Sequence, residues 1–438
     1  MRKIALLFII LFNLVGLIGC TKNNQNDDSK EEEKYYTVMF NSNGGTLVEG
    51  EYYQIVKENE SAIPPVYERK HYVFAGWDTE FDNVKSDLVV TAIWEVEIKK
   101  MRNIKSNDLI KEMRAGWNLG NTFDAPGETL WGNPRTTKEM IDFVKAAGFN
   151  VIRIPVTWEG HFNIHTYQID SNYLNRVQEV VDYAIDGKTF VIINMHHERW
   201  NDTTYENQEL GSLIMEKLWT QIAIRFQGYD EHLIFEGMNE PRKYNASSSI
   251  QWGGDKETFD VINHFNQVFV DTIRKAPGNN KKRHLMITTC GGGISTTLAK
   301  NLKLIDDDYV IVSIHSYAPY NFAHDYTTET TFDKFNPKDT VPIDSALDVA
   351  YNYWIKNGQA VIIGEYASRD KKNLEARLEW LEYYLEKATN YGIPCIWWDT
   401  GQAVSDTTNT FAIFNRRKLE WYFPEIVEKI MEITESRK

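Results

Sequence analysis

The sequence has few cysteines and no excess of positive charge. Its 438 residues include only Cys20, Cys290 and Cys395, and three cysteines do not make a disulfide framework. The formal net charge of -14 argues against nucleic acid as a ligand, because that binding depends on clustered Lys and Arg. The remaining composition, with 42% hydrophobic and 25% charged residues, is typical of a folded, soluble chain.

An apolar run opens the chain, and it is short for a membrane span. Two basic residues precede an apolar core, Ile4 to Ile18, which ends in Leu17-Ile-Gly-Cys20, as an export signal does. The final tetrapeptide resembles a bacterial lipobox, whose Cys becomes the lipidated first residue of the mature protein. We therefore expect residues 1–20 to be a lipoprotein signal peptide, with Cys20 anchoring the protein outside a bacterial membrane. A retained transmembrane helix is the alternative, which the short apolar core disfavours.

Two further segments precede the main body of the chain. Residues 21–34 are polar and charged without periodicity, and we expect a flexible tether there. Residues 35–97 contain alternating, strand-like runs and a strong Asn-Gly-Gly turn. This second segment resembles the internalin-type B repeat (the Listeria–Bacteroides repeat), a small β-grasp-like unit of bacterial surface proteins. The resemblance rests on Phe40-Asn-Ser-Asn-Gly-Gly45, Gly76-Trp77 and Ala92-Ile-Trp94.

The two tryptophans of this small module have two interpretations. Exposed rings of Trp77 and Trp94 would suit a flat sugar face. In so small a module they are more easily explained as its core, and that is what we expect.

Residues 103–438 alternate strand-like and helical runs. Eight strands close a (β/α)8 barrel, so the expected fold class is α/β, a TIM barrel preceded by the small β-grasp-like module. A doubly wound open sheet is the alternative, but no Gly-rich phosphate loop follows the first strand. Gly291-Gly-Gly293 lacks the Lys and the spacing of a nucleotide site. The expected strands begin near Met113, Val151, Phe190, Leu233, His284, Val310, Ala360 and Pro394.

Helical patterns lie between these strands. Thr136 and Glu139 have the spacing of a capping box before a helix over 140–147. The fifth helix is poorly marked, and we expect a short piece around 297–302. The remaining helices are expected at 170–185, 213–226, 259–274, 346–356, 374–391 and 424–433.

Two glutamates follow buried strands. The apolar run that starts at Leu233 leads to Glu240, where Pro241 prevents further strand pairing. The run Ala360-Val-Ile-Ile-Gly364 delivers Glu365 in the same way. An α/β barrel carries its chemistry at the carboxyl ends of its strands, and two carboxylates there are what a retaining glycosidase needs. A capping or salt-bridge role is common for a single Glu, but the pair in this setting favours catalysis.

Motifs at several predicted strand ends match one family in chain order. The region from about Ile104 to about Phe423 resembles glycoside hydrolase family 5, the cellulase family. Its members cleave β-linked glucans and mannans with retention on a (β/α)8 barrel. The first two motifs look most like endoglucanases and xyloglucanases of cellulolytic anaerobes. The motifs are Ala115-Gly-Trp-Asn-Leu-Gly-Asn121, Trp131-Gly-Asn-Pro134, Val151-Ile-Arg-Ile-Pro-Val-Thr-Trp158, Ile192-Ile-Asn-Met-His-His197, Asn239-Glu-Pro241, His315-Ser-Tyr317, Gly364-Glu-Tyr366 and Trp397-Trp398.

The resemblance and the residue chemistry together assign roles. Glu240 is expected to be the general acid, with a pKa raised by its surroundings. Glu365 is expected to be the nucleophile, kept ionised by Arg153, and Asn239 to hydrogen-bond the sugar 2-hydroxyl. The other expected substrate-binding residues are His196, His197, His315, Tyr317 and Trp398.

The spacing of the histidines bears on metal binding. His196 and His197 are neighbours on a predicted strand and should point to opposite faces. This argues against a zinc site, and we expect no metal and no cofactor. His315 and Tyr317 are two residues apart and should face the same side. The resemblance places them near the acid and the nucleophile, respectively.

The loops after the strands should form the walls of a cleft. The loop 316–342 is long and aromatic, and such loops usually serve binding. Trp200 and Trp252 are candidates for flanking sugar sites, with plain packing as the alternative for each. Trp398 matches the platform under the sugar at the cleavage point, and Trp397 should point away into the core.

We therefore expect a monomeric, extracellular, lipid-anchored endo-β-1,4-glucanase. Its expected substrates are cellulose, mixed-linkage β-glucan or xyloglucan, hydrolysed with retention. One alternative is a mannanase or xylanase of the same barrel clan, because backbone preference depends on loop geometry. The other is a non-catalytic surface glycan-binding protein, which the loss of Glu240 or Glu365 would favour, yet both are present.

Overall fold

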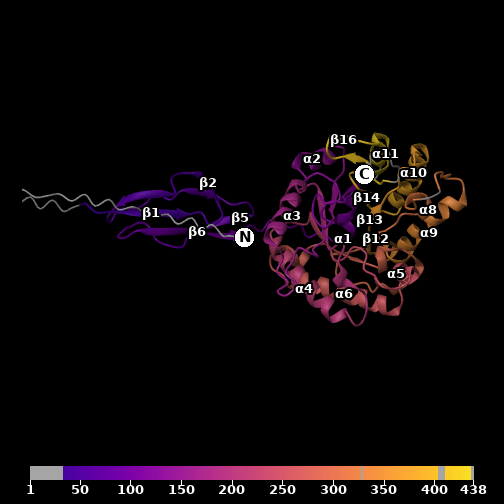
Figure 1. Cartoon of the computed structure of the whole chain (residues 1–438), viewed down its shortest axis with the longest axis horizontal. Coiled ribbons are helices and arrows are strands. Elements are labelled where there is room, and N and C mark those ends of the chain that lie inside the picture. The colour runs from indigo at the N-terminus through magenta and orange to yellow at the C-terminus, as the bar shows by residue number, and fades with distance from the viewer. Residues whose placement is uncertain (1–32, 327–328, 403–409, 436–438) are drawn as a thin grey trace, which may run out of the picture. The chain divides into compact units, whose positions relative to one another are not determined.

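The computed structural model describes residues 33–326, 329–402 and 410–435. It divides into two compact units, one that ends at Glu95 and one that begins at Val96 (Figure 1). The predicted signal peptide, including Cys20, and most of the predicted tether lie outside the described residues. Among the described helices, none is long and apolar enough to cross a membrane.

The first unit consists of two small sheets. The larger sheet has the order β3-β1-β6-β5, and β2 pairs with β4 in the smaller one. Asn43 and Gly44, with φ of 47° and 88°, form the predicted turn after β1. The strands are β1 (Tyr35–Asn41), β2 (Thr46–Glu49), β3 (Tyr53–Lys57), β4 (Val66–Glu68), β5 (Tyr72–Trp77) and β6 (Leu88–Val96).

The core of this unit is small and partly aromatic. Val38 and Phe40 of β1 are buried together with Val90 of β6. Trp77 and Trp94 are partly buried and pack against this cluster, and the Phe40 and Trp77 ring centroids are 5.0 Å apart. The prediction that both tryptophans belong to the core is confirmed.

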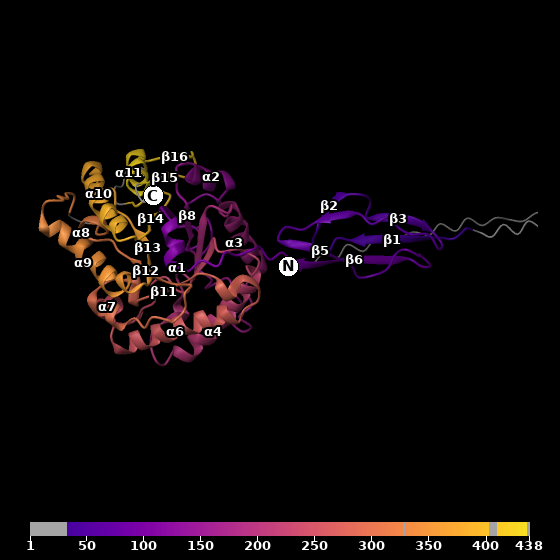
Figure 2. The ribbon, with the colours of Figure 1, turned by 180° about the vertical axis from the view of Figure 1, so that it is seen from behind.

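The second unit is a closed barrel of eight parallel strands, which confirms the predicted fold class. The strand order around the barrel is β10-β11-β12-β13-β14-β7-β8-β9, and helices surround it (Figure 2). The first strand begins at Ala115 instead of near Met113, and the other starts agree to within one residue. The strands are β7 (Ala115–Leu119), β8 (Val151–Ile154), β9 (Phe190–Asn194), β10 (Leu233–Glu236), β11 (Leu285–Thr288), β12 (Val310–His315), β13 (Ala360–Tyr366) and β14 (Cys395–Asp399).

Helices and short turns connect the strands. A short hairpin of β15 (Phe414–Asn415) and β16 (Glu420–Trp421) follows the barrel. The α-helices are α1 (Ser106–Leu109), α2 (Lys138–Ala146), α3 (Ser171–Ala184), α4 (Gln208–Arg225), α5 (Ser248–Gly253), α6 (Lys256–Lys275), α7 (Thr296–Asn301), α8 (Tyr320–Ala323), α9 (Pro337–Tyr353), α10 (Leu374–Asn390) and α11 (Pro424–Glu435). The 3-10 turns are η1 (Ile110–Glu112), η2 (Arg199–Asn201), η3 (Gly278–Lys282), η4 (Cys290–Gly292) and η5 (Ile355–Asn357).

The start of α2 corrects the predicted capping box. The N-cap is Thr137, whose side chain accepts a hydrogen bond from the backbone N of Met140 at 3.4 Å. The backbone N–H of Thr136 donates instead to Glu128 at 2.8 Å. The N-cap is therefore one residue later than the predicted Thr136, while the helix begins at Lys138, two residues before the expected 140.

The start of α9 corrects the predicted long loop. This helix begins at Pro337, where the side chain of Asn336 accepts from the backbone N of Lys338 at 3.1 Å. A proline at the first helical turn lacks the N–H that would otherwise need a partner. The helix was expected only from about 346, and α8 further divides the segment 316–342. The loop is therefore shorter than predicted.

The barrel interior has two layers of different polarity. Successive strand residues point to opposite faces, so Val151 and Arg153 of β8 share the inward face. Val151 belongs to a buried apolar cluster that also contains Ile192, Ile234, Met286, Ile311, Ile362 and Ile396. We call this cluster the lower layer. The next inward positions along five strands form what we call the upper layer, which consists of fully buried Asn118, Arg153, Asn194, Glu236 and Ser313.

Candidate active site

The two predicted catalytic glutamates meet above the upper layer. Glu365 lies in β13, and Glu240 lies in the loop after β10. One oxygen of each carboxylate and one nitrogen of His315 all lie within 4.8 Å of one another. Retaining glycosidases hold their two carboxyl groups roughly 5.5 Å apart, whereas inverting ones need about 6.5 Å or more to admit a water. The close spacing fits direct attack by one carboxylate.

Glu365 is held by two donors. The Nη1 of Arg153 donates to its Oε1 at 2.9 Å, and the hydroxyl of Tyr317 donates to its Oε2 at 2.8 Å. Burial raises the pKa of Glu365 above the usual range of a carboxyl, against the opposing positive charges of His315 and Arg153. Both oxygens are thus fixed, and the group becomes easier to protonate than an exposed glutamate.

Glu240 is held by basic side chains. Its Oε1 lies 2.9 Å from Nδ1 of His315, and Arg242 donates to its Oε2 at 3.4 Å. Burial acts to raise the pKa of Glu240, but the hydrogen bond and charge of His315 outweigh it and lower the pKa. The predicted rise is therefore wrong for the substrate-free protein, because a basic ring lies beside the carboxylate.

The pKa of His315 moves in the opposite direction to that of Glu240. Burial acts to lower the pKa of this histidine, but the charges of Glu365 and Glu240 raise it. The ring lies between the two carboxylates, 2.9 Å from Glu240 and 3.6 Å from Glu365. The three groups therefore titrate as a coupled unit, in which the His315–Glu240 contact joins a ring whose pKa is raised to a carboxyl whose pKa is lowered.

Arg153 connects both sides of this site. Its guanidinium is fully buried and donates to Asn118 Oδ1 at 2.9 Å and to Asn239 Oδ1 at 2.7 Å, besides Glu365. A second carboxylate, Glu236, accepts from its Nε at 2.8 Å. A single cation therefore orients the nucleophile and the residue before the acid.

Sequence reasoning missed the rest of the upper layer. Glu236, Asn118, Asn194 and Ser313 bind one another or Arg153. The signal available in the sequence was a charged or amide residue inside an otherwise apolar strand, as in Leu233-Ile-Phe-Glu236. Such a residue must find a partner inside the barrel, because an unpaired buried charge is very costly.

The histidine pair after β9 does not point to opposite faces of a strand, which was the predicted reason against a metal site. His196 and His197 lie beyond the strand end, and their ring centroids are only 4.4 Å apart. Together with Asp124 they bring possible ligand atoms within 4.8 Å of one another. The Asp124 carboxylate, however, already accepts the backbone N–H groups of Asn121 and Thr122 at 3.0 and 2.6 Å. We assign no metal to this group.

Trp398 and His196 form an aromatic surface beside the carboxylates. Their rings are parallel to within 4°, with centroids 5.6 Å apart. Burial lowers the pKa of His196 well below its usual value, so this ring is a neutral hydrogen-bonding group. His197 is exposed, and its centroid lies 6.1 Å from that of Trp131. Trp397 is fully buried on the other face of β14.

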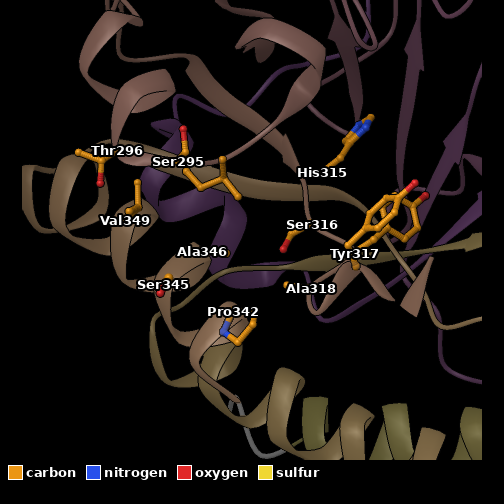
Figure 3. Close-up of a pocket in the computed structure, with 12 residues that line it drawn as sticks. Ser295, Thr296, His315, Ser316, Tyr317, Ala318, Pro342, Ser345, Ala346 and Val349 are labelled. Atoms are coloured by element: carbon orange, nitrogen blue, oxygen red, sulfur yellow. The ribbon is translucent and has the colours of Figure 1, made fainter. Parts of the chain in front are cut away.

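A pocket of about 520 Å³ opens beside His315 and Tyr317. Its walls come from the loop after β11, the loop after β12 and helix α9, as Figure 3 shows. The lining combines hydroxyls with short apolar side chains: Ser295, Thr296, Ser316, Ser345, Ala318, Pro342, Ala346 and Val349.

The two loop tryptophans have different surroundings. Trp200 is buried, and its Nε1 donates to Glu198 at 2.6 Å, so it packs inside the protein and does not form a flanking sugar site. Trp252 is 47% exposed, and the guanidinium carbon of Arg242 lies 4.5 Å from its ring centroid. Only Trp252 keeps a face that a sugar could reach.

A (β/α)8 barrel with a close pair of carboxylates at its strand ends is typical of a retaining glycoside hydrolase. The model of the family Cellulase (glycosyl hydrolase family 5) matches residues 112–404. The chain belongs to this family.

Characterised relatives agree with the assignment. Endoglucanase B of Clostridium cellulovorans is 46% identical, over 75% of this chain and 76% of that protein. Cellulase/esterase CelE of Acetivibrio thermocellus is also 46% identical over 77% of this chain, which spans only 41% of that longer protein. A solved GH5-4 broad specificity endoglucanase from Ruminococcus champanellensis, with bound cellotriose, has a TM-score of 0.72. It is 41% identical, with 76% of this chain and 100% of that chain covered.

Proposed function

We propose that this protein is an endo-β-1,4-glucanase that hydrolyses β-linked glucans with retention of configuration. The observation that carries the proposal is the placement of Glu240 and Glu365, with oxygens within 4.8 Å of each other. Their different partners support different roles. Arg153 and Tyr317 bind Glu365, whereas His315, whose pKa is raised, binds Glu240.

In the first step, Glu365 attacks the anomeric carbon and the bond to the leaving sugar breaks. The hydrogen bonds from Arg153 and Tyr317 hold both carboxylate oxygens, so the attacking oxygen is fixed in direction. The proton on the His315–Glu240 pair passes through Glu240 to the leaving oxygen. Asn239, oriented by Arg153 at 2.7 Å, is placed to bind the sugar 2-hydroxyl.

In the second step, a water attacks the glycosyl ester on Glu365. Esterification removes the negative charge of Glu365, and Glu240 now acts as the base that takes a proton from the water. The sugar departs with its original anomeric configuration. The pair performs all bond breaking, so the scheme needs no step through a metal.

The substrate is proposed from the walls of the site. Trp398 offers a ring on which a sugar can stack, and we assign the pocket beside His315 and Tyr317 to the leaving sugars. Endoglucanase B of Clostridium cellulovorans and the solved endoglucanase with bound cellotriose support a β-1,4-glucan backbone. Mannan and xylan are the second candidates, and the same substrate panel tests them.

The test is a panel of purified cellulose, mixed-linkage β-glucan, xyloglucan, mannan and xylan, with the first product followed by proton NMR. We expect the glucans to be cleaved internally and the β-anomer to form first. Initial formation of the α-anomer would refute the retaining mechanism. Cleavage of mannan or xylan alone would refute the glucan assignment.

We also propose that the protein is a monomeric lipoprotein held at the outer face of a bacterial membrane by Cys20. The apolar start and the Leu17-Ile-Gly-Cys20 sequence support this, and the small module then acts as an internalin-type spacer. Mass spectrometry of the mature chain should find an acylated Cys20 at its start. An unmodified Cys20 within a longer mature chain would overturn the proposal.

A further inference from the structure

Glu236 is a fully buried carboxylate that the reaction scheme does not use. It is the last residue of β10 and belongs to the upper layer. Its Oε1 accepts from the hydroxyl of Ser313 at 2.6 Å. Its Oε2 accepts from Asn194 Nδ2 at 2.9 Å and from Nε of Arg153 at 2.8 Å, with Nη2 of the same guanidinium at 2.7 Å. Three hydrogen bonds and the ion pair with Arg153 therefore fix it in one orientation.

Arg153 has no spare hydrogen-bonding group once these contacts are made. Nε and one side of Nη2 face Glu236, while Nη2 also donates to Asn239. Nη1 donates to Glu365 at 2.9 Å, and Asn118 is its other partner. Because the guanidinium is planar and rigid, the edge held by Glu236 determines where the edge that meets Glu365 points.

Charge gives this arrangement a second consequence. One buried cation, Arg153, faces two buried carboxylates, Glu236 and Glu365. The other titratable groups that face Glu365 are His315, Glu240 and Tyr317. A nucleophile opposite an unshared Arg would be ionised more easily and would be a weaker base. A second carboxylate on the same Arg moderates this effect.

We propose that Glu236 is a positioning residue that orients Arg153 toward the nucleophile and shares its positive charge. It never touches the substrate, and it acts on Glu365 only through Arg153. Asn194, which binds both Glu236 and the ring of His196 at 3.2 Å, extends the same support toward the aromatic surface. The inference rests on the proposed retaining mechanism, which the NMR assay of the wild type tests separately.

The decisive variant is Glu236→Gln. A Gln can keep its oxygen toward Arg153 and Asn194 and donate its amide to Ser313 Oγ, which is able to accept. The fold and most contacts should therefore remain, and only the charge is lost. We expect kcat to fall about 10- to 100-fold with KM changed less than about threefold. We also expect the acid limb of kcat/KM to move to lower pH by about one unit, because Arg153 now stabilises ionised Glu365 alone.

Two further variants separate charge from geometry. Glu236→Asp keeps the charge, but the shorter side chain moves the carboxylate away from Arg153. We therefore expect kcat to fall while the acid limb stays in place. Ser313→Ala removes one of the donors that hold Glu236 without changing the charge, so kcat should fall while the acid limb stays within about 0.2 pH units of the wild type. Thermal unfolding of each variant gives the folded fraction to which the rates are normalised.

An acid limb in Glu236→Gln that coincides with that of the wild type would overturn the proposal. Equal shifts of the acid limb in the Gln and Asp variants would also overturn the proposal, because the charge of Glu236 would then not be the cause of the shift. If the Gln variant does not fold, the Asp variant decides. In the Asp variant, a fall in kcat above about tenfold with an unmoved acid limb supports the proposal, and a kcat within about twofold of the wild type overturns it.

Discussion

The barrel buries charged side chains, whereas the small module keeps all of its described charged side chains at least partly exposed. Arg153 and Glu236 of the barrel are fully buried, and their charges are met by fixed partners. In the small module, the exposed residues include large apolar side chains such as Tyr53, Ile55 and Val89. A unit of this size covers little of its own surface, so it offers no dry interior in which a carboxylate could be activated. Chemistry is therefore expected in the barrel alone.

The sharpest test of this contrast is the loss of one carboxylate. Glu365→Ala should reduce glucan hydrolysis by about 10⁴-fold or more, because no other group can form the glycosyl ester. Glu240→Ala should have a similar effect on glucans and a smaller one on substrates with a good leaving group. Turnover is measured as reducing sugar released from a soluble β-glucan.

Azide distinguishes the two roles. It should partly restore the activity of the Glu365→Ala variant and give a glycosyl azide of inverted configuration. The small anion attacks the anomeric carbon from the side where the Glu365 carboxylate stood. The control is Glu425→Ala, an exposed glutamate of α11, which should leave turnover unchanged. Activity near the wild-type level in Glu365→Ala or Glu240→Ala would refute the proposed mechanism.

The pH dependence of kcat/KM tests the buried charges as a group. The pKa of Glu365 is raised, so activity should fall with decreasing pH already above the ordinary glutamate value of about 4.3. The pKa of His315 is raised too, so its ring should lose a proton only above the ordinary histidine value of about 6.5. Below the pKa of Glu365 and above the pKa of His315, kcat/KM should fall about tenfold per pH unit.

Initial rates across a pH series with a soluble glucan provide this measurement. His315→Gln removes the titrating ring and should displace the alkaline limb. An alkaline limb in the same position in this variant would show that His315 does not hold the proton.

A smaller effect is expected from filling the pocket beside His315. Ser345 is exposed on α9 and lines this pocket, so Ser345→Trp should not disturb the core. We expect KM for a β-glucan to rise about 3- to 10-fold, while an aryl cellobioside with a small leaving group is cleaved as before. Ser345→Ala is the matched control. Equal losses on both substrates would show that the pocket does not receive the leaving sugars.

The smallest effect should come from removing the small module. A chain that begins at Val96 retains the hydrogen bond from the backbone N of Lys99 to the carbonyl of Gly228 at 2.9 Å. We expect its turnover on soluble glucan to stay within about twofold of the full chain. Any loss should appear on insoluble substrate, where an additional contact raises the effective concentration. If the trimmed chain folds but no longer cleaves soluble glucan, the module contributes to the active site.

The sequence by itself determined the alternation of strands and helices and the eight-stranded barrel. Its hydrophobic periods of 2 and 3.6 are local properties of the chain, and the strand starts followed from them to within two residues. It also placed Glu240, Glu365, His315 and Tyr317 near strand ends. Helix starts were less certain, as at Thr137 and Pro337, because caps depend on which nearby side chains are already bound.

Only the tertiary structure decided which strand ends share a charge and in which direction each pKa of the site is shifted. Arg153, Glu236 and Glu365 come from three strands that are far apart in sequence, and no local pattern states that one guanidinium serves both carboxylates. The order of the pKa values depends on burial and on His315 lying between the two glutamates. Electrostatic energies depend on distance and dielectric, and both are properties of the folded barrel.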